Sequence, residues 1–156
     1  MILNASAVIA RKIKEWNPEE TIDEERMTYA LALQINKYGV IFISLLAGLF
    51  LGSVVQCIIA MVSFALLRRF TGGYHFRSLT MCTLMTAAII VFSSKLPINN
   101  LYTVLLNIVS SLLVLRFSNR RIMPATLIIS VNFIFLNPAA ALAFFSQSLL
   151  LISKWR

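Results

Sequence analysis

The sequence consists mainly of long apolar segments separated by short basic ones. Uncharged runs of 30, 17, 20 and 32 residues cover positions 38–67, 78–94, 96–115 and 122–153. About 20 apolar residues span the hydrocarbon core of a bilayer, so two of these runs fit one helix each, and the other two are too long for one comfortable helix. The pattern predicts an all-α, polytopic membrane protein built from short transmembrane helices.

The last run contains a helix breaker in its middle. Asn137 precedes Pro138, and a residue in that position disfavours the helical conformation. The break predicts two short helices, and Pro124 suits the first turn of the earlier one. These helices are Met123–Leu136 and Ala139–Ser153.

The first long run contains Gly48 and Gly52, spaced as in a GxxxG motif. One helix over Gly39–Leu67 would be about 43 Å long, which exceeds a core of about 30 Å even with some tilt. The glycines therefore favour a turn or kink, although the motif is also typical of a close helix–helix contact and of a possible homodimer face. With breaks in both long runs the chain has about six spans. Because both ends on one side require an even number of crossings, four spans are the alternative if one break is only a kink or is re-entrant.

The N-terminal 37 residues differ from the rest because they are amphipathic. Apolar residues recur at helical spacing, with basic residues off that line, which predicts a helix lying in the membrane interface. A second amphipathic helix is expected to begin at Asn17-Pro18-Glu19-Glu20 and to run to about Asn36. We therefore divide the chain into interfacial helices over 1–37 and a transmembrane unit over 38–156. The apolar line is Ile2, Ala5, Ile9, Ile13 and Trp16.

Charge is as unevenly distributed as hydropathy. The sequence is 59% hydrophobic and 13% charged, all six acids lie within residues 15–25, and none follows Arg26. The apolar part cannot supply a two-carboxylate hydrolase site, a carboxylate-bound Mg²⁺ or a Ser-His-Asp triad. One His and two Cys cannot form a closed Zn²⁺ site. No metal or other cofactor is expected.

The basic residues indicate how the chain is oriented. They cluster around residues 68–77 and 116–121, in the N-terminal segment and at the C-terminus, whereas the connection at 95–100 has one lysine. The positive-inside rule predicts both termini and both arginine clusters in the cytoplasm, with 95–100 outside a multi-pass cell-membrane protein. The net charge of +8 favours an acidic peptide or anionic membrane lipids as partners. Nucleic acid is not expected, because no base-stacking motif accompanies the basic residues.

Candidate chemistry is confined to residues 68–82. His75 and Cys82 are seven residues apart, and a neighbouring imidazole is the usual device that activates a Cys nucleophile. On one straight helix they would be about 10.5 Å apart, so His75 must lie off the Cys82 helix. Gly72-Gly73 allows such a turn.

Ser78 is a plausible N-cap, and this places Cys82 in the first turn of a helix. There the helix dipole and Arg77 would favour a thiolate. The alternatives are that Cys82 is a small packing residue and His75 a solvated loop residue. Cys57, in the middle of an apolar segment, is expected to pack rather than react or form a disulfide with Cys82. With no carboxylate nearby we expect a His–Cys dyad, which an amide such as Asn119 or Gln56 could assist.

The segment Arg68-Arg69-Phe70-Thr71-Gly72-Gly73-Tyr74-His75, with Cys82 seven residues later, resembles the accessory gene regulator B (AgrB) family. These are membrane cysteine peptidases of quorum sensing. The resemblance implies thiol protease chemistry on an AgrD-like precursor peptide with amphipathic and acidic segments, which is cleaved and cyclised as a thiolactone or lactone autoinducing peptide.

Specific roles follow from the same resemblance. It implies that Cys82 is the nucleophile and His75 its base, and that Arg68 and Gly73 occupy other important motif positions. Supporting or substrate-binding cations would be Arg69, Arg77, Arg120 and Arg121, the last two in a basic loop before Pro124. That loop is short, without lysine and without basic residues after the proline, which departs from the family pattern. A non-catalytic scaffold and a small transporter, binding a peptide or anionic lipid, are the competing hypotheses.

Overall fold

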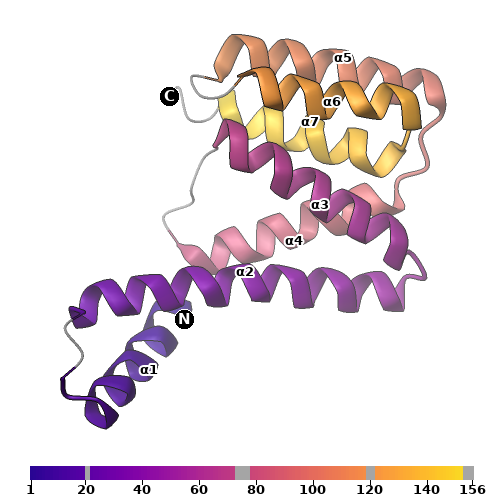
Figure 1. Cartoon of the computed structure of the whole chain (residues 1–156). Coiled ribbons are helices and arrows are strands. Elements are labelled where there is room, and N and C mark those ends of the chain that lie inside the picture. Colours follow the sequence, from indigo (N-terminus) through magenta and orange to yellow (C-terminus); the bar gives the residue numbers. More distant parts are fainter. Residues whose placement is uncertain (20–21, 73–77, 119–121, 153–156) are drawn as a thin grey trace. The chain divides into compact units, whose positions relative to one another are not determined.

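The structure of the chain is a computed structural model, which describes residues 1–19, 22–72, 78–118 and 122–152. Within these ranges the chain forms seven α-helices and no strand (Figure 1). The predicted all-α class is confirmed. The helices are α1 (Ile2–Trp16), α2 (Glu24–Phe50), α3 (Val54–Thr71), α4 (Leu79–Lys95), α5 (Asn100–Phe117), α6 (Ile122–Phe135) and α7 (Pro138–Ile152).

The described residues group into two compact units. The N-terminal unit contains residues 1–43 and the first part of α4, up to Ala87. The C-terminal unit contains residues 44–72, the rest of α4 from Ala88, and α5, α6 and α7. The division of the chain into interfacial helices over 1–37 and a transmembrane unit over 38–156 stays a prediction.

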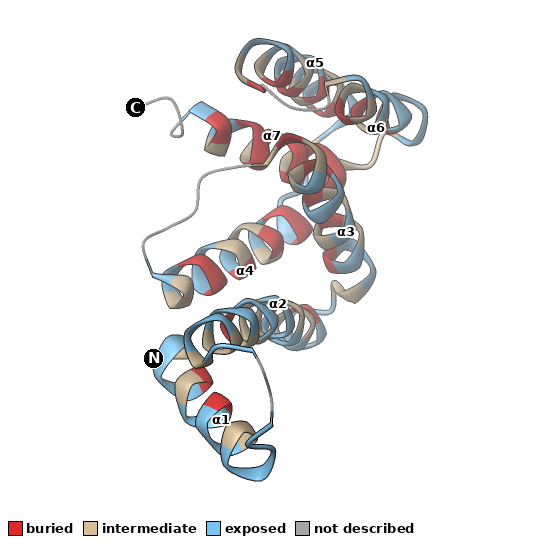
Figure 2. Ribbon diagram, turned by 60° about the vertical axis from the view of Figure 1, so that its left-hand side comes forward, coloured by how far each residue is buried: buried red, intermediate tan, exposed pale blue. Residues whose placement is uncertain are grey.

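The predicted first amphipathic helix is confirmed as α1. It packs through small residues, since Ser6 and Ala10 are fully buried. Several of its larger apolar side chains remain exposed, and Trp16 is 84% exposed. Figure 2 shows most of α1 in the colours of exposed and intermediate residues. An interfacial helix offers such a surface to the acyl chains of a membrane.

The predicted start of the second helix is wrong. Asn17 does not begin a helix but ends α1, because its backbone N–H donates to the carbonyl of Ile13 at 2.9 Å. Pro18 follows, and its ring excludes the helical conformation for the residue before it. The next helix begins at Glu24, and its acidic first turn, Glu24 and Glu25, complements the helix dipole.

The expected end of that helix near Asn36 is also wrong, because α2 continues for 27 residues into the apolar run. Nothing between Asn36 and Gly39 breaks a helix; glycine costs only about 1 kcal/mol there. Gly39 moreover allows α2 to pack tightly in the N-terminal unit, since a Cβ at this position would lie 3.3 Å from Cγ2 of Thr83 on α4.

The predicted break at Gly48–Gly52 is confirmed, and the two glycines have different roles. Gly52 lies between α2 and α3 with φ +63°, a conformation that favours glycine. Gly48 is still helical and buried, and a Cβ added there would lie 3.1 Å from Cβ of Cys57 on α3. The motif therefore serves a turn and a close contact within one chain. Homodimerisation stays a prediction.

The break at Asn137-Pro138 is confirmed as well. The side chain of Asn132, in the last turn of α6, stabilises the turn at this break. Its oxygen accepts the backbone N–H of Asn137 at 3.1 Å, and its Nδ2 donates to the Asn137 carbonyl at 3.1 Å. Nδ2 also lies 3.2 Å from Oδ1 of Asn107 on α5. Asn137 in turn reaches Gln56 on α3, where the two side chains are 3.3 Å apart. The side-chain oxygen of Asn137 also accepts the backbone N–H of Ala140 in α7 at 3.2 Å. A polar network thus joins α3, α5, α6 and α7.

The core of the C-terminal unit lies between α3, α5, α6 and α7. Its buried apolar residues come from all four helices, so each helix is fixed by burial as well as by the amide network. They are Leu67, Val114, Ala125, Ile129, Ala140, Phe144 and Leu151.

The helices fit a membrane protein. By length and composition α2, α3 and α5 could each cross a membrane, and α4, α6 and α7 are shorter apolar helices. At 14 and 15 residues, α6 and α7 are about 21 and 22 Å long, less than a core of about 30 Å. The choice between six and four spans stays a prediction.

Candidate active site

The structure describes three of the eight residues expected at the site: Cys82, Arg68 and Arg69. Gly73, His75, Arg77, Arg120 and Arg121 lie outside the described residues, as does Asn119. Cys82 belongs to the N-terminal unit, and the two arginines belong to the C-terminal unit. The site is therefore described in two parts.

Cys82 lies in the first turn of α4, as predicted. The helix begins at Leu79, and the backbone N–H of Cys82 donates to the carbonyl of Ser78 at 3.0 Å, which puts Ser78 in the N-cap position. The thiol is free and 5% exposed. Its position at the positive end of a helix dipole suits a cysteine nucleophile, whereas its burial is equally typical of a cysteine that packs.

Polar contacts hold this first turn in place. The hydroxyl of Thr83 lies 2.6 Å from Oδ1 of Asn36 on α2 and 3.0 Å from the carbonyl of Leu79. On the other side, the backbone N–H of Ile2 in α1 reaches the hydroxyl of Thr80 at 3.5 Å. Sequence reasoning missed these contacts, although two threonines flanking a cysteine in an apolar run are a signal that could have been noted.

The two arginines end α3. Arg68 and Arg69 lie in its last turn, where cations interact favourably with the helix dipole. The guanidinium of Arg68 lies 5.9 Å from the ring centre of Phe64, and Arg69 is exposed. The two arginines could bind an anion, or they could stabilise the end of the helix by interacting with its dipole. The described residues fit both roles.

The predicted glycine turn begins at Gly72, directly after α3. Gly72 has φ 73° and ψ −143°, a conformation accessible mainly to glycine. Its carbonyl accepts a hydrogen bond from Nε2 of Gln147 on α7 at 2.6 Å. Gln147 was not predicted. Gln56 was predicted as an amide that could assist the dyad. It lies in the first turn of α3, about 22 Å along the helix from Thr71. It is therefore a poor candidate to assist the segment that follows Gly72.

Cys57 is a packing residue, as expected. It is fully buried, free, and its thiol lies 3.0 Å from the carbonyl of Ser44, to which it donates. Both cysteines are free. Among the described residues there is also no group of three metal-ligating side chains.

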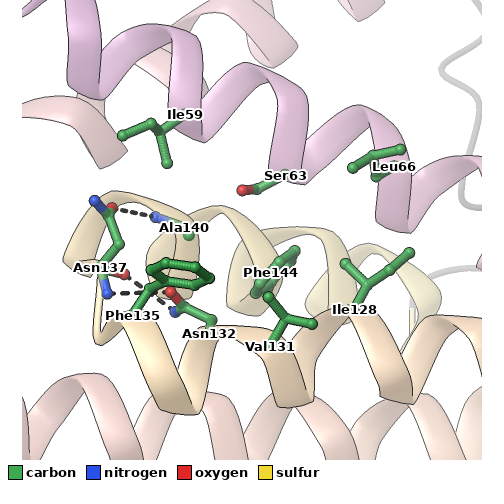
Figure 3. Close-up of a pocket in the computed structure, with 10 residues that line it drawn as sticks. All are labelled: Ile59, Ser63, Leu66, Ile128, Val131, Asn132, Phe135, Asn137, Ala140 and Phe144. Atoms are coloured by element: carbon green, nitrogen blue, oxygen red, sulfur yellow. Dashed lines mark hydrogen bonds between the residues drawn. The ribbon is translucent and has the colours of Figure 1, made fainter.

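An apolar pocket of about 470 Å³ lies between α3, α6 and α7 (Figure 3). Its wall is mostly aliphatic and aromatic, with the amides of Asn132 and Asn137 at one end. Cys82, Arg68 and Arg69 do not line it. In a membrane such a pocket suits an acyl chain, and it adds no chemistry to the site.

Two comparisons with known proteins bear on these residues. The family described as accessory gene regulator B matches residues 6–123, a stretch that contains both His75 and Cys82. A curated relative from Halalkalibacterium halodurans, whose name calls it AgrB-like and no more, is 27% identical over 119 residues. The match covers 76% of this chain but 60% of the relative, so the chain spans about three fifths of the relative's length. No solved structure matches.

Proposed function

Because this chain belongs to the accessory gene regulator B family, we propose that it is a membrane cysteine peptidase that processes a quorum-sensing precursor peptide. Cys82 is the nucleophile, His75 its base, and the cleaved fragment is released as a cyclic thiolactone or lactone. The single observation that best supports this function is the free, buried thiol of Cys82 in the first turn of α4. The site faces the cytoplasm.

The reaction proceeds in two acyl transfers. The imidazole of His75 takes the proton of the Cys82 thiol, and the thiolate attacks the scissile carbonyl of the precursor. The C–N bond breaks, the leaving amine takes the proton from the imidazolium, and a thioester to Cys82 remains. A Cys thiol or Ser hydroxyl of the same peptide then gives its proton to the imidazole and attacks this thioester. The new ring bond forms, the C–S bond to Cys82 breaks, and the returning proton restores the thiol.

One feature of the chain, the burial of Cys82, suits cyclisation rather than hydrolysis. Thioester exchange needs no ATP, because one acyl bond is replaced by another of similar energy. Water would divert the thioester to a linear product, so exclusion of water matters. Cys82 is 5% exposed even within the isolated chain, and its apolar surroundings would limit access further.

The arginines bind and orient the precursor in this proposal. Arg68, Arg69 and Arg77 precede the nucleophile, and Arg120 and Arg121 belong to the second cluster. Together they attract the acidic segment of the precursor, with no carboxylate nearby in the sequence to neutralise them. The amphipathic segment of the precursor lies in the interface alongside α1, whose large apolar side chains are exposed.

A non-catalytic scaffold or a small transporter is the competing function. Ion-coupled transport usually needs ionisable groups inside the membrane. In α3, α4 and α5 the charged residues lie in the last turns of the helices, which is typical of topology signals, and α6 and α7 contain no charged residue. This distribution favours the peptidase.

The test is co-expression of the chain with a small precursor peptide that has an amphipathic segment and an acidic tail. Cys82→Ala and His75→Ala should each abolish cleavage while leaving membrane insertion intact, and Cys57→Ala should cleave like the wild type. Cleavage that survives Cys82→Ala but is lost with Cys57→Ala would reverse the assignment. A peptide that binds without being cleaved would favour the scaffold.

A further inference from the structure

A second pocket, of about 330 Å³, lies where α3 and α7 begin and α4 ends. All the residues that line it belong to the C-terminal unit. Its wall differs from that of the apolar pocket, because it contains three serines, an amide and a lysine. None of these lining residues is among those proposed for catalysis or for binding of the precursor, so the pocket requires its own explanation.

Ser93 is the residue of this pocket that packing does not explain. It is 4% exposed and lines the pocket, but its hydroxyl forms no hydrogen bond with any described residue. Its neighbour Ser94 behaves differently, since that hydroxyl donates to the carbonyl of Val91 at 2.7 Å. A buried hydroxyl is normally paired. The Ser93 hydroxyl is therefore a donor available to a group inside the pocket.

Two helices begin at the same pocket. Ser53 is the N-cap residue of α3, but its side chain does not cap the helix and lies instead 3.4 Å from the hydroxyl of Ser94. The first N–H groups of α3 therefore lack the side-chain acceptor that usually satisfies one of them. Pro138 and Ala139, the first residues of α7, also line the pocket. The N-terminus of a helix attracts anions through its free N–H groups and its dipole.

Lys95 adds a full positive charge at this pocket. It is the last residue of α4 and is exposed, and the sequence contains no Asp or Glu after Glu25 that could neutralise it. The C-terminus of α4 carries about half a negative charge, which offsets one of the two helix N-termini. The lysine and the other N-terminus then leave an excess of roughly +1.5. This excess suits an anion.

We propose that this pocket binds the phosphate group of a membrane phospholipid. A phosphodiester carries one negative charge, and its oxygens accept hydrogen bonds from the ammonium of Lys95, the hydroxyl of Ser93 and the first N–H groups of α3. The source is a lipid because the end of α4 is otherwise apolar and exposed at Phe92 and Leu96, a surface that faces acyl chains in a membrane. The inference goes beyond the peptidase function and does not depend on it.

Native mass spectrometry of the full-length protein in detergent tests the proposal with defined probes. Palmitoyl lysophosphatidylglycerol carries the phosphodiester, and monopalmitin has the same acyl chain and a glycerol without phosphate. We expect one saturable adduct with the lysophospholipid, with a Kd about tenfold or more below that for monopalmitin, because hydrogen bonds to a charged group are the strong ones. Equal affinity for the two probes would overturn the proposal.

Substitutions in the pocket connect the binding to these residues. Lys95→Gln should raise the Kd for the lysophospholipid about tenfold, and Ser93→Ala about three- to tenfold. Lys95→Arg should bind like the wild type, because it keeps the charge. Two controls should leave the Kd within about twofold of wild type. Lys37→Gln removes an exposed lysine from α2, and Ser110→Ala removes a buried serine hydroxyl from α5.

The remaining outcomes are equally decisive. Equal weakening by Lys95→Gln and Lys37→Gln would mean that net charge attracts the lipid and that no site exists. An unchanged Kd in Lys95→Gln would also overturn the proposal, and this exposed position can be tested even if Ser93→Ala fails to fold. Equilibrium dialysis with inorganic phosphate in the same detergent distinguishes the sources. Phosphate should bind much more weakly than the lysophospholipid, and equally tight binding would make free phosphate the ligand and contradict the lipid. No precursor is present in any of these measurements, so their failure would leave the peptidase proposal unaffected.

Discussion

The hydroxyl of Thr83 lies 2.6 Å from Oδ1 of Asn36, and this contact joins α4 to α2 one residue after Cys82. Asn36 lies on a helix 47 residues earlier in the chain. Since Thr83 is buried, the bond is shielded from competing water. It fixes the height and rotation of the first turn of α4 within the N-terminal unit, and hence the direction in which the Cys82 thiol points.

Thr83→Val tests this relationship, because valine has the shape of threonine without the hydroxyl. Loss of one buried hydrogen bond should lower the free energy of unfolding by about 1 kcal/mol. The larger effect should be on kcat, which we expect to fall about tenfold, as small displacements of a nucleophile are costly. Steady-state kinetics with the precursor would measure the change in kcat.

Thr103→Val is the control, since Thr103 is also buried but lies on α5 and binds only the carbonyl of Asn99. Equal kinetic losses in both variants would mean that Thr83 does not position Cys82.

The amide network predicts a second, purely structural effect. Asn132 makes three hydrogen bonds, to Asn107 and to both backbone groups of Asn137. Buried bonds between membrane helices are worth about 0.6 kcal/mol each on average, so Asn132→Leu should lower the free energy of unfolding by about 2 kcal/mol. Reversible unfolding in mixed micelles would measure this. Ser130→Ala should change little, because that exposed hydroxyl binds only its own helix at Thr126. If Asn132→Leu left the free energy of unfolding unchanged, the break between α6 and α7 would not depend on this amide.

The two helix breaks were predictable because each depends on local stereochemistry. Pro138 disfavours a helical residue before it whatever surrounds it, and Gly52 adopts a positive φ that other residues avoid. The start of α2 was not predictable in the same way. Asn17 and Pro18 begin many helices but here end one, and which role they take depends on α1 continuing as far as Trp16.

The candidate site was predictable only in part, for a related reason. Ser78 and Cys82 lie within one helical turn, so their spacing alone predicts the position of the thiol. Asn36 and Gln147 act on partners 47 and 75 residues away. Such pairings depend on tertiary packing, and no period or motif in the sequence indicates them.

Membrane topology can be tested by labelling single cysteines introduced by Asn4→Cys, Ile98→Cys and Asn119→Cys in protein that also carries Cys57→Ala and Cys82→Ala. The positive-inside rule predicts that positions 4 and 119 react with an impermeant maleimide only after the membrane is opened, whereas position 98 reacts in intact cells. A reactive position 4 in intact cells would place the N-terminus outside and contradict the prediction that both termini are cytoplasmic.

The arginine clusters should act mainly on substrate binding. Replacing Arg120 and Arg121 with Gln should raise KM more than it lowers kcat, because these charges attract substrate and transition state alike. Added salt should have the same effect in the wild type, since attraction between exposed charges is screened within about 8 Å at physiological ionic strength. Arg68→Gln should instead lower kcat, given its place close to the glycine turn. If salt has no effect and both changes alter only kcat, the arginines set topology and do not steer the precursor.

The most direct test of the central claim is mass spectrometry of the protein after a brief reaction with a precursor whose ring-closing Cys or Ser is replaced by Ala. Without that nucleophile the second acyl transfer cannot occur, so the peptide fragment should accumulate as a thioester. We predict an adduct on Cys82 that hydroxylamine removes, and that is absent in Cys82→Ala and in His75→Ala but present in Cys57→Ala. A cleaved precursor without an adduct on Cys82, or an adduct that persists in Cys82→Ala, would contradict the proposed mechanism.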